Sequence, residues 1–362
     1  MLPALAIAEG LVAKGHAAAS IHYVGAKRGI ETRLLPPSGF PHTFLEVTGL
    51  QRQLTPAKLA ANVAMPFKMI RAMAQAWRLL GRLRPSVIVS VGGYASLPAI
   101  LAARLHGVPI IVVSYDKRPG WASKVAARFA RVCATGYEGM PLPHAVHTGS
   151  PLRQSILTVD RHRDRAAARQ LFGLPEDRFV LGVFGGSQGA GLLNSATNDF
   201  VERNADRRDL AVRHIVGERF MGTTSPARTG SSGLQYQVIG YEDHMPQVYA
   251  AADLMLVRGG ASTIAELAAI GVPAIVVPWA LAADDHQTIN AAILADHGGA
   301  ISIPEVSFTA DRLSDEVLRL VAAPEELAEI GRRAWEQGAT HRSGRLIDLI
   351  DEVGRGRFES AS

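Results

Sequence analysis

Short apolar runs alternate with longer helix-like stretches along most of the chain. In its first part, β-rich runs predict strands at 21–24, 44–47, 87–91, 110–114 and 146–148, and helical patterns occupy 2–14, 66–83 and 97–106. After a charged segment at 160–169 the pattern restarts, with predicted strands at 179–184, 213–216, 236–239, 254–257 and 274–277. Alternating strands and helices predict parallel sheets covered on both faces, and the restart predicts two of them.

The restart divides the chain into two predicted Rossmann-like, doubly wound α/β domains. We expect an N-terminal domain at 1–152 and a C-terminal domain at 153–337. The last segment, 338–362, is predicted to return as a helix towards the first domain and to end in a frayed tail. Ligands of open α/β sheets bind beyond the carboxyl ends of the strands, so two such domains facing each other would form a cleft with one substrate on each side.

Composition narrows the class of protein. The chain has 362 residues, enough for two α/β domains, and 48% of them are hydrophobic. No run reaches the ~18 apolar residues of a spanning helix. Cys133 is the only cysteine, so it forms no internal disulfide, and we expect it in the core. The net charge of +5 suits an anionic partner, but the basic residues are spread along the chain, which favours anionic lipid or a phosphorylated substrate over nucleic acid.

The segment 258–266, RGGASTIAE, is the most informative motif. It follows an apolar run, so a strand would pass through a turn of small residues into a helix. The unpaired N–H groups at the start of such a helix, with the hydroxyls of Ser262 and Thr263, are suited to bind phosphate. Glu266 lies one turn later, where a carboxylate could accept hydrogen bonds from two ribose hydroxyls. The pattern predicts a nucleotide-diphosphate site.

Three other loops follow predicted strands. GGSQGA at 185–190 would let backbone approach a ligand closely, DDHQTIN at 284–290 could bind sugar hydroxyls, and GGYAS at 92–96 repeats the strand–glycine–helix pattern. Each has a plain alternative: a simple turn at 185–190, a helix N-cap supplied by Asp285, and a packing turn at 92–96. The spacing at 284–290 does not favour a metal, and none is predicted.

The segment 54–84 mixes large apolar residues with lysine and arginine. Exposed apolar residues bordered by basic ones are typical of a helix that lies on a membrane surface. A helix packed on the core, with a solvated basic face, would have the same composition. Both interpretations stay open at this point.

The order of motifs resembles the MurG family of GT-B glycosyltransferases over nearly the whole chain. The resemblance is carried by PALA at 3–6, GGY at 92–94, GSPLR at 149–153, GGSQGA at 185–190, RGGASTIAE at 258–266 and HQ with NA at 286–291. It implies an inverting transfer of N-acetylglucosamine from UDP-GlcNAc to lipid I, the undecaprenyl-pyrophosphoryl-muramyl-pentapeptide, to form lipid II in peptidoglycan synthesis. It also implies a peripheral protein on the cytoplasmic face of the cell membrane, without a cofactor or a bound metal.

The resemblance also assigns roles to residues of this chain. Ser187, Asn194 and the helix start at Ser262 and Thr263 would face the UDP diphosphate. Arg153 and Arg258 would support the donor pocket, and the Glu242 backbone would face uracil. Glu266 would bind the ribose, and His286 with Gln287 the GlcNAc hydroxyls. On the acceptor side would lie Gly92, Gly93 and Tyr94, and the region 66–80 would dock on the anionic membrane surface.

The chain departs from the family pattern in two places. The family has a glycine loop ending in a histidine, a candidate general base, directly before the PALA stretch, and here the chain begins after it. We interpret this as a start codon placed too late, because a domain without its first strand would leave a central sheet position unpaired. The family's His-Glu-Gln-Asn motif is replaced by VSYD at 113–116, so Asp116 becomes the candidate base.

Three other functions fit the same motifs. They are a GT-B transferase with another acceptor, a catalytically impaired UDP-sugar-binding paralogue, and a sugar-nucleotide epimerase of the same fold. The basic apolar helix argues against the epimerase, because it implies a membrane-bound partner.

Overall fold

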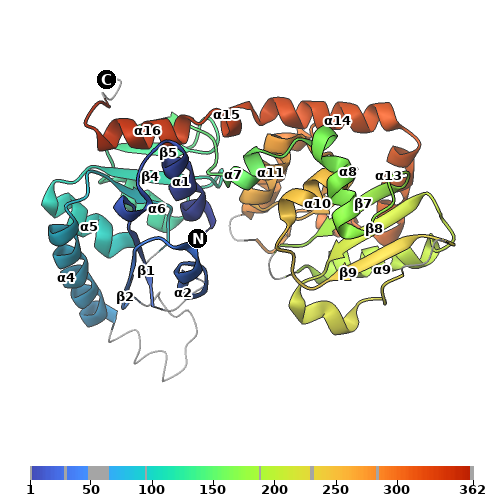
Figure 1. Cartoon of the computed structure of the whole chain (residues 1–362), viewed down its shortest axis with the longest axis horizontal. Helices are drawn as coiled ribbons and strands as arrows, with labels where there is room; N and C mark the ends of the chain where they lie inside the picture. The colour runs from blue at the N-terminus through green and yellow to red at the C-terminus, as the bar shows by residue number, and fades with distance from the viewer. Residues whose placement is uncertain are drawn as a thin grey trace. The chain divides into compact units, whose positions relative to one another are not determined.

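The chain forms two compact α/β units in a computed structural model that describes residues 2–27, 31–47, 65–93, 96–186, 189–228, 232–282 and 285–358. The first unit comprises Met1–Gln154 with Ser343–Ser362, and the second Ser155–Arg342 (Figure 1). All ladders between the named strands are parallel. The predicted fold class of two parallel α/β domains is confirmed.

The strands of the first unit pair in two sheets, ordered β1-β2 and β3-β4-β5-β6. The strands are β1 (Tyr23–Ala26), β2 (His42–Leu45), β3 (Ile88–Ser90), β4 (Ile110–Ser114), β5 (Val132–Thr135) and β6 (Ala145–His147). The helices are α1 (Leu2–Ala13), α2 (Glu31–Leu34), α4 (Met65–Leu83), α5 (Leu97–His106), α6 (Trp121–Ala127) and α16 (Arg345–Gly354), with 3₁₀ turns η1 (Ala18–Ser20) and η2 (Pro36–Ser38). Within the described ranges no ladder joins β1 or β2 to β3, so the sheet is interrupted between these strands.

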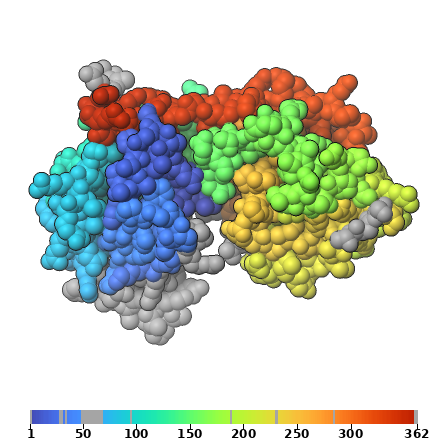
Figure 2. Space-filling view, in the orientation of Figure 1, coloured from blue at the N-terminus to red at the C-terminus, as the bar shows by residue number. Residues whose placement is uncertain are grey.

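The last helix of the chain completes the core of the first unit. Helix α16 lies beside α1 (Figures 1 and 2), and a Cβ atom at Gly10 would overlap the Ile347 side chain. Leu349 and Ile350 are buried with Ile7 and with the strand residues of β4 and β5. Cys133 is buried in the neighbouring cluster, as expected, and burial raises the pKa of its thiol to about 11.

Helix α4 has one face packed on the core and another on which apolar residues are exposed, so it combines features of both interpretations of the segment 54–84. Ala72, Ala76 and Leu80 are buried against α5 and β4, so one face packs on the core. Ile70 and Trp77 lie on the exposed face, which is bordered by arginines at 71, 78 and 82. In the described part of the chain, no helix combines the length and apolar character needed to cross a bilayer.

The second unit contains one six-stranded sheet, ordered β12-β11-β10-β7-β8-β9. Its strands are β7 (Phe179–Phe184), β8 (Leu210–Ile215), β9 (Gln235–Ile239), β10 (Leu254–Val257), β11 (Ala274–Val276) and β12 (Ile301–Ser302). Its helices are α7 (Gln154–Leu157), α8 (Arg161–Phe172), α9 (Gly191–Arg203), α10 (Met245–Ala251), α11 (Ala261–Ile270), α12 (His286–Ala295), α13 (Ala310–Val321), α14 (Pro324–Gln337) and α15 (Ala339–Arg342), with 3₁₀ turns η4 (Glu218–Thr223) and η6 (Glu305–Ser307).

The central strands β7, β10 and β11 are apolar on both faces, as expected for a parallel sheet that helices cover on both sides. Leu181, Val183, Leu254 and Leu256 are fully buried together with residues of α9 and α13, including Phe200. The sheet therefore forms the rigid centre from which the loops at its carboxyl edge project.

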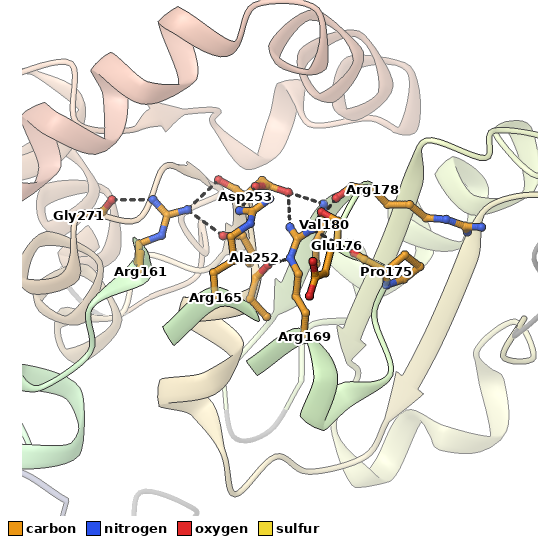
Figure 3. Close-up of polar contacts among 11 residues, drawn as sticks. Arg161, Arg165, Arg169, Pro175, Glu176, Arg178, Val180, Ala252, Asp253 and Gly271 are labelled. Atoms are coloured by element: carbon orange, nitrogen blue, oxygen red, sulfur yellow. Dashed lines mark hydrogen bonds and ion pairs between the residues drawn. The ribbon is translucent and has the colours of Figure 1, made fainter. Parts of the chain in front are cut away.

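A buried ion-pair cluster fixes α8 to the opposite, amino edge of the sheet (Figure 3). The Asp253 carboxylate pairs with Arg165 and with Arg169, whose Nη2 donates over 2.7 Å, and it accepts the Val180 N–H over 2.7 Å. Arg161 donates to the carbonyl oxygens of Ala252 (2.8 Å) and Gly271 (3.1 Å). The three arginines are spaced by four residues, so they share one face of α8.

Arg169 is the most buried member of the cluster, with no exposed surface. Its guanidinium donates to the Ala251 and Arg178 carbonyl oxygens, over 3.1 and 2.9 Å, as well as to Asp253. Burial lowers the pKa of Arg169 and, more strongly, that of Arg161, to about 10. Both remain cations at neutral pH, so Asp253 supplies the counter-charge that makes their burial tolerable.

We predict that Asp253→Asn lowers the free energy of unfolding of the second unit by about 3–5 kcal/mol, because it leaves buried guanidinium groups without their anion. Chemical denaturation measures the loss. The matched control is Asp311→Asn, which removes an exposed pair with Arg203 and should change stability by less than about 0.5 kcal/mol. Similar losses in both variants would contradict the role given to Asp253.

Candidate functional site

Three loops of the second unit follow adjacent strands and so meet at one edge of the sheet. The loop at 185–190 follows β7, the loop at 258–260 follows β10, and the loop at 277–285 follows β11, in the order β11-β10-β7. The helices that follow these loops, α9, α11 and α12, begin at this edge. The predicted arrangement of helix N-termini beyond the carboxyl ends of the strands is therefore present.

The glycine loop after β7 lies directly against the backbone at the end of β8. Gly189 has φ +68°, and a Cβ atom there would overlap the Val216 carbonyl oxygen. The Gly189 N–H donates to the Gly186 carbonyl oxygen over 2.8 Å, which closes the turn. Glycine is required at 189 for both reasons. Ser187, expected to face a diphosphate, lies outside the described residues.

Asn194, which was expected to face a diphosphate, has a buried side chain. It lies on the face of α9 that packs on the sheet, and its Nδ2 donates to the Val216 carbonyl oxygen over 3.0 Å. Its Oδ1 is 3.0 Å from His214 Nε2, and His214 Nδ1 is 2.8 Å from the Tyr236 hydroxyl. Burial lowers the pKa of His214 to about 3, so this network is uncharged. Asn194 therefore holds the glycine loop and the start of α9 in place.

The start of α11 matches the expectation of an uncapped helix N-terminus. Gly260 occupies the N-cap position and supplies no capping side chain. Ser262 is exposed and Thr263 is half-buried, so both hydroxyls lie near the surface of the first turn. First-turn amides without a side-chain cap are suited to accept an anion.

Glu266 is held in a fixed orientation one turn further along α11. The hydroxyl of Tyr249, which is fully buried, donates to its Oε2 over 2.7 Å. Glu266 itself is half-buried. Tyr249 was not predicted, because nothing in the local sequence of α10 distinguishes it from a core tyrosine.

The first turn of α12 lies directly against the loop that precedes α11. A Cβ atom at Gly259 would overlap the Gln287 carbonyl oxygen, and the buried Asn290 donates to the Gly259 carbonyl oxygen over 3.3 Å. This close approach places His286 and Gln287 next to the start of α11. Gln287 also accepts the Trp279 N–H through Oε1 over 3.0 Å.

Asp285 does not cap α12, although the sequence offered that alternative. It occupies the N-cap position with φ +53°, in the left-handed region, and makes no side-chain capping bond. An N-cap residue normally has an extended backbone, which directs its side chain at the first-turn amides.

Arg258 joins its own loop to the loop after β11 and to the turn η6 through its guanidinium. Its Nη1 donates to the Val277 and Pro278 carbonyl oxygens over 3.1 and 3.3 Å, and its Nη2 pairs with Glu305 over 2.7 Å. Glu305 was not predicted, since an acidic residue in a loop gives no sequence signal by itself. Arg258 is therefore held by contacts within the second unit, and its role in supporting a donor pocket stays a prediction.

Glu242 is buried at the turn after β9. Its carboxylate pairs with Arg213 and accepts the His244 N–H over 2.8 Å. Arg213 lies over the Phe172 ring, 3.6 Å from its centroid. These contacts fix the backbone of the turn, which is the part of Glu242 expected to be used.

The candidate acceptor residues belong to the first unit. Gly92 and Gly93 both have positive φ, +89° and +88°, in the loop between β3 and α5, and Ser96 donates to the Gly93 carbonyl oxygen over 2.8 Å. Gly92 approaches Ser123 at the start of α6. Tyr94 lies outside the described residues.

Asp116 and Arg153 are half-buried in loops of the first unit. Asp116 follows β4, beside Tyr115 and Tyr137. Burial raises the pKa of both phenols, and the Asp116 carboxylate raises each further. Arg153 lies between β6 and α7. Among the described residues, no group of His, Cys, Asp or Glu side chains is arranged to hold a metal ion.

We predict that Gly259→Ala lowers the free energy of unfolding of the second unit by about 1–3 kcal/mol, because α12 must move away from the loop before α11. Urea unfolding measures this loss. Gly222→Ala is the control, since a Cβ atom there meets nothing within 4 Å, and it should cost less than about 0.5 kcal/mol. A Gly259→Ala variant as stable as the control would contradict the close approach.

Sequence comparison identifies relatives of nearly full length. A protein of Acidothermus cellulolyticus named "UDP-N-acetylglucosamine--N-acetylmuramyl-(pentapeptide) pyrophosphoryl-undecaprenol N-acetylglucosamine transferase" is 38% identical over 357 residues, covering 98% of this chain and 95% of the relative. A protein of the same name from a Nocardioides species is 36% identical, and the match covers 92% of this chain and 89% of the relative.

Solved structures show the same architecture. MurG of Acinetobacter baumannii superimposes with a TM-score of 0.72 at 26% identity, covering 97% of this chain and 95% of that one. UDP-GlcNAc 2-epimerase of Neisseria meningitidis, bound to UDP-GlcNAc, has a TM-score of 0.63 at 12% identity, covering 97% and 96%. The second match shows only that the fold is shared.

Two family models account for most of the sequence. The glycosyltransferase family 28 N-terminal domain matches residues 1–135, and the glycosyltransferase family 28 C-terminal domain matches residues 180–346. Together with the relatives above 30% identity, these matches show that the chain belongs to glycosyltransferase family 28 and, within it, to the MurG family.

Proposed function

We propose that the protein transfers N-acetylglucosamine from UDP-GlcNAc to the undecaprenyl-pyrophosphoryl-muramyl-pentapeptide, which yields lipid II. The names of its relatives describe this transfer. The observation in the structure that carries the proposal is the uncapped start of α11 between the glycine loop of β7 and the first turn of α12. A nucleotide-sugar pyrophosphate has the charge and size that this group of helix ends would bind.

The donor would bind along the carboxyl edge of the second unit. We assign its pyrophosphate to the amides of the α11 start with Ser262 and Thr263, and its ribose hydroxyls to Glu266. The Tyr249 hydroxyl holds the Glu266 carboxylate, so little ordering is needed on binding. His286 and Gln287 would contact the sugar hydroxyls, because the backbone contact at Gly259 places them beside the start of α11.

The reaction would invert the anomeric centre. An acceptor hydroxyl attacks the anomeric carbon, the bond to the UDP oxygen breaks, and the acceptor proton passes to a base. Helix N-termini would stabilise the charge that develops on the diphosphate, so we propose no resident cofactor. Asp116 is our candidate for the base in the described part of the chain, with Gly92 and Gly93 on the acceptor side.

The acceptor is lipid-linked, which accounts for the exposed apolar face of α4. Ile70 and Trp77 are exposed there, and Leu105 is exposed at the end of the adjoining α5. Arginines at 71, 78, 82 and 104 border these residues and would attract anionic lipid. We propose that this face docks on the cytoplasmic surface of the cell membrane.

The activity is tested with radiolabelled UDP-GlcNAc and lipid I in mixed micelles. The expected product is labelled lipid II, with release of UDP. Transfer to another acceptor but not to lipid I would reject the proposed acceptor, and UDP-GlcNAc binding without any transfer would reject the enzymatic function.

We predict that Glu266→Ala weakens UDP binding about 10–100-fold, because two hydrogen bonds to a charged acceptor are lost. Calorimetric titration measures the change. Binding of 2′,3′-dideoxy-UDP should differ little between the variant and the wild type, since the lost contacts are to those hydroxyls. Glu325→Ala, an exposed residue of α14, is the control and should leave UDP binding unchanged. An equal loss for UDP and its dideoxy analogue would contradict the assignment.

We predict that Ile70→Glu reduces binding to vesicles containing phosphatidylglycerol several-fold, because it places a carboxylate in the apolar face of α4. Co-sedimentation measures the bound fraction, and wild-type binding should fall as salt is added. The control is Leu171→Glu, which changes another exposed apolar residue, on α8. Equal losses in both variants would argue against α4 as the docking face.

A further inference from the structure

The loop that leads from β11 into α12 leaves its large apolar side chains in solvent. Trp279 is 46% exposed and Leu281 is 80% exposed. Val306, on the neighbouring turn η6, is 92% exposed. Val277 and Ala282, on either side of this segment, are buried. Burial contributes little at 279–281, where polar contacts to the backbone hold the loop.

Three side chains from other parts of the second unit make these contacts. Glu305 Oε2 accepts the Ala280 N–H over 2.7 Å, and Gln287 Oε1 accepts the Trp279 N–H over 3.0 Å. Arg258 donates to two carbonyl oxygens where the loop begins. Of these three side chains, Glu305 alone lies outside the motifs identified in the sequence, on η6 after β12.

Glu305 and Arg258 form a largely desolvated ion pair. Their side chains are 20% and 10% exposed, and Arg258 Nη2 lies 2.7 Å from Glu305 Oε1. Burial acts to raise the pKa of Glu305, but the Ala280 amide and the Arg258 guanidinium together lower it below its usual value. The carboxylate is ionised at neutral pH, so both of its hydrogen bonds are charge-assisted.

We propose that Glu305 is a positioning residue for the sugar end of the donor site. This inference rests on the proposed function, because it takes His286 and Gln287 as the residues that contact the sugar. One oxygen of Glu305 holds Ala280, in the loop that leads into the first turn of α12, and the other holds Arg258, which fixes the start of the same loop. The ribose contact through Glu266 and Tyr249 does not involve Glu305.

The test compares the affinities of the Glu305→Gln variant for two ligands, UDP-GlcNAc and UDP. In Glu305→Gln one oxygen is replaced by an amide that cannot accept, so the loop loses either Ala280 or Arg258. We expect calorimetric titration to show UDP-GlcNAc binding weakened about tenfold and UDP binding changed less than about twofold, because only the sugar contacts depend on the loop. In steady-state assays, KM for UDP-GlcNAc should rise with the same variant.

Two further variants make the result specific. Glu305→Asp keeps the charge on a shorter side chain and should recover part of the UDP-GlcNAc affinity. If Glu305→Gln fails to fold, the same titrations are made with Glu305→Asp. Its affinity for UDP-GlcNAc should then fall by an intermediate amount, and its affinity for UDP should not change. Glu329→Gln removes a carboxylate that pairs with Arg332 and Arg333 on the exposed face of α14, and it should change neither affinity.

Two outcomes would overturn the role of Glu305. Equal weakening for UDP and UDP-GlcNAc would show a general structural effect, and unchanged affinity for both would show that the loop does not need this anchor. Wild-type protein that binds neither ligand would instead reject the proposed function, and the inference with it. Normal UDP binding by the variant also reports that the second unit is folded.

Discussion

The second unit depends on one constraint, which is the close backbone approach between the loop before α11 and the first turn of α12. Gly259 has no side chain, so the Gln287 carbonyl oxygen can lie where a Cβ atom would be. The consequence is that two helices begin side by side at the carboxyl edge of the sheet. Helix N-termini carry partial positive charge and unpaired N–H groups, so their convergence favours an anionic ligand in a way that a single helix end does not.

Polar groups at both edges of the sheet hold this arrangement in place. At the amino edge, Asp253 neutralises arginines of α8 that would otherwise be buried without an anion. At the carboxyl edge, Asn194 and His214 form an uncharged network beneath the glycine loop, and Arg258 with Glu305 anchors the loop before α12. The site loops thus rest on side chains to which we assign no ligand contact.

Hydrophobic periodicity predicted the fold well, because most strands are short apolar runs between glycine-rich turns. Strands β7, β10 and β4 have the predicted bounds. The predicted strand at 213–216 instead spans Leu210–Ile215. Its polar residues Arg213 and His214 are buried through specific partners that a polarity pattern cannot show. Strands β5 and β12 were missed, since one is embedded in an alanine-rich stretch and the other spans only Ile301–Ser302. Motifs located the site loops, but the residues that orient them, Tyr249 and Glu305, could not be found without knowing which side chains meet in space.

The central claim is that the start of α11 binds the pyrophosphate of a uridine nucleotide sugar. The most direct measurement is a crystal structure of the protein with UDP-GlcNAc. The account predicts pyrophosphate oxygens within hydrogen-bonding distance of the backbone amides and hydroxyls at Ser262 and Thr263, with the ribose on Glu266. A pyrophosphate bound away from this helix start, with α11 left unoccupied, would contradict it.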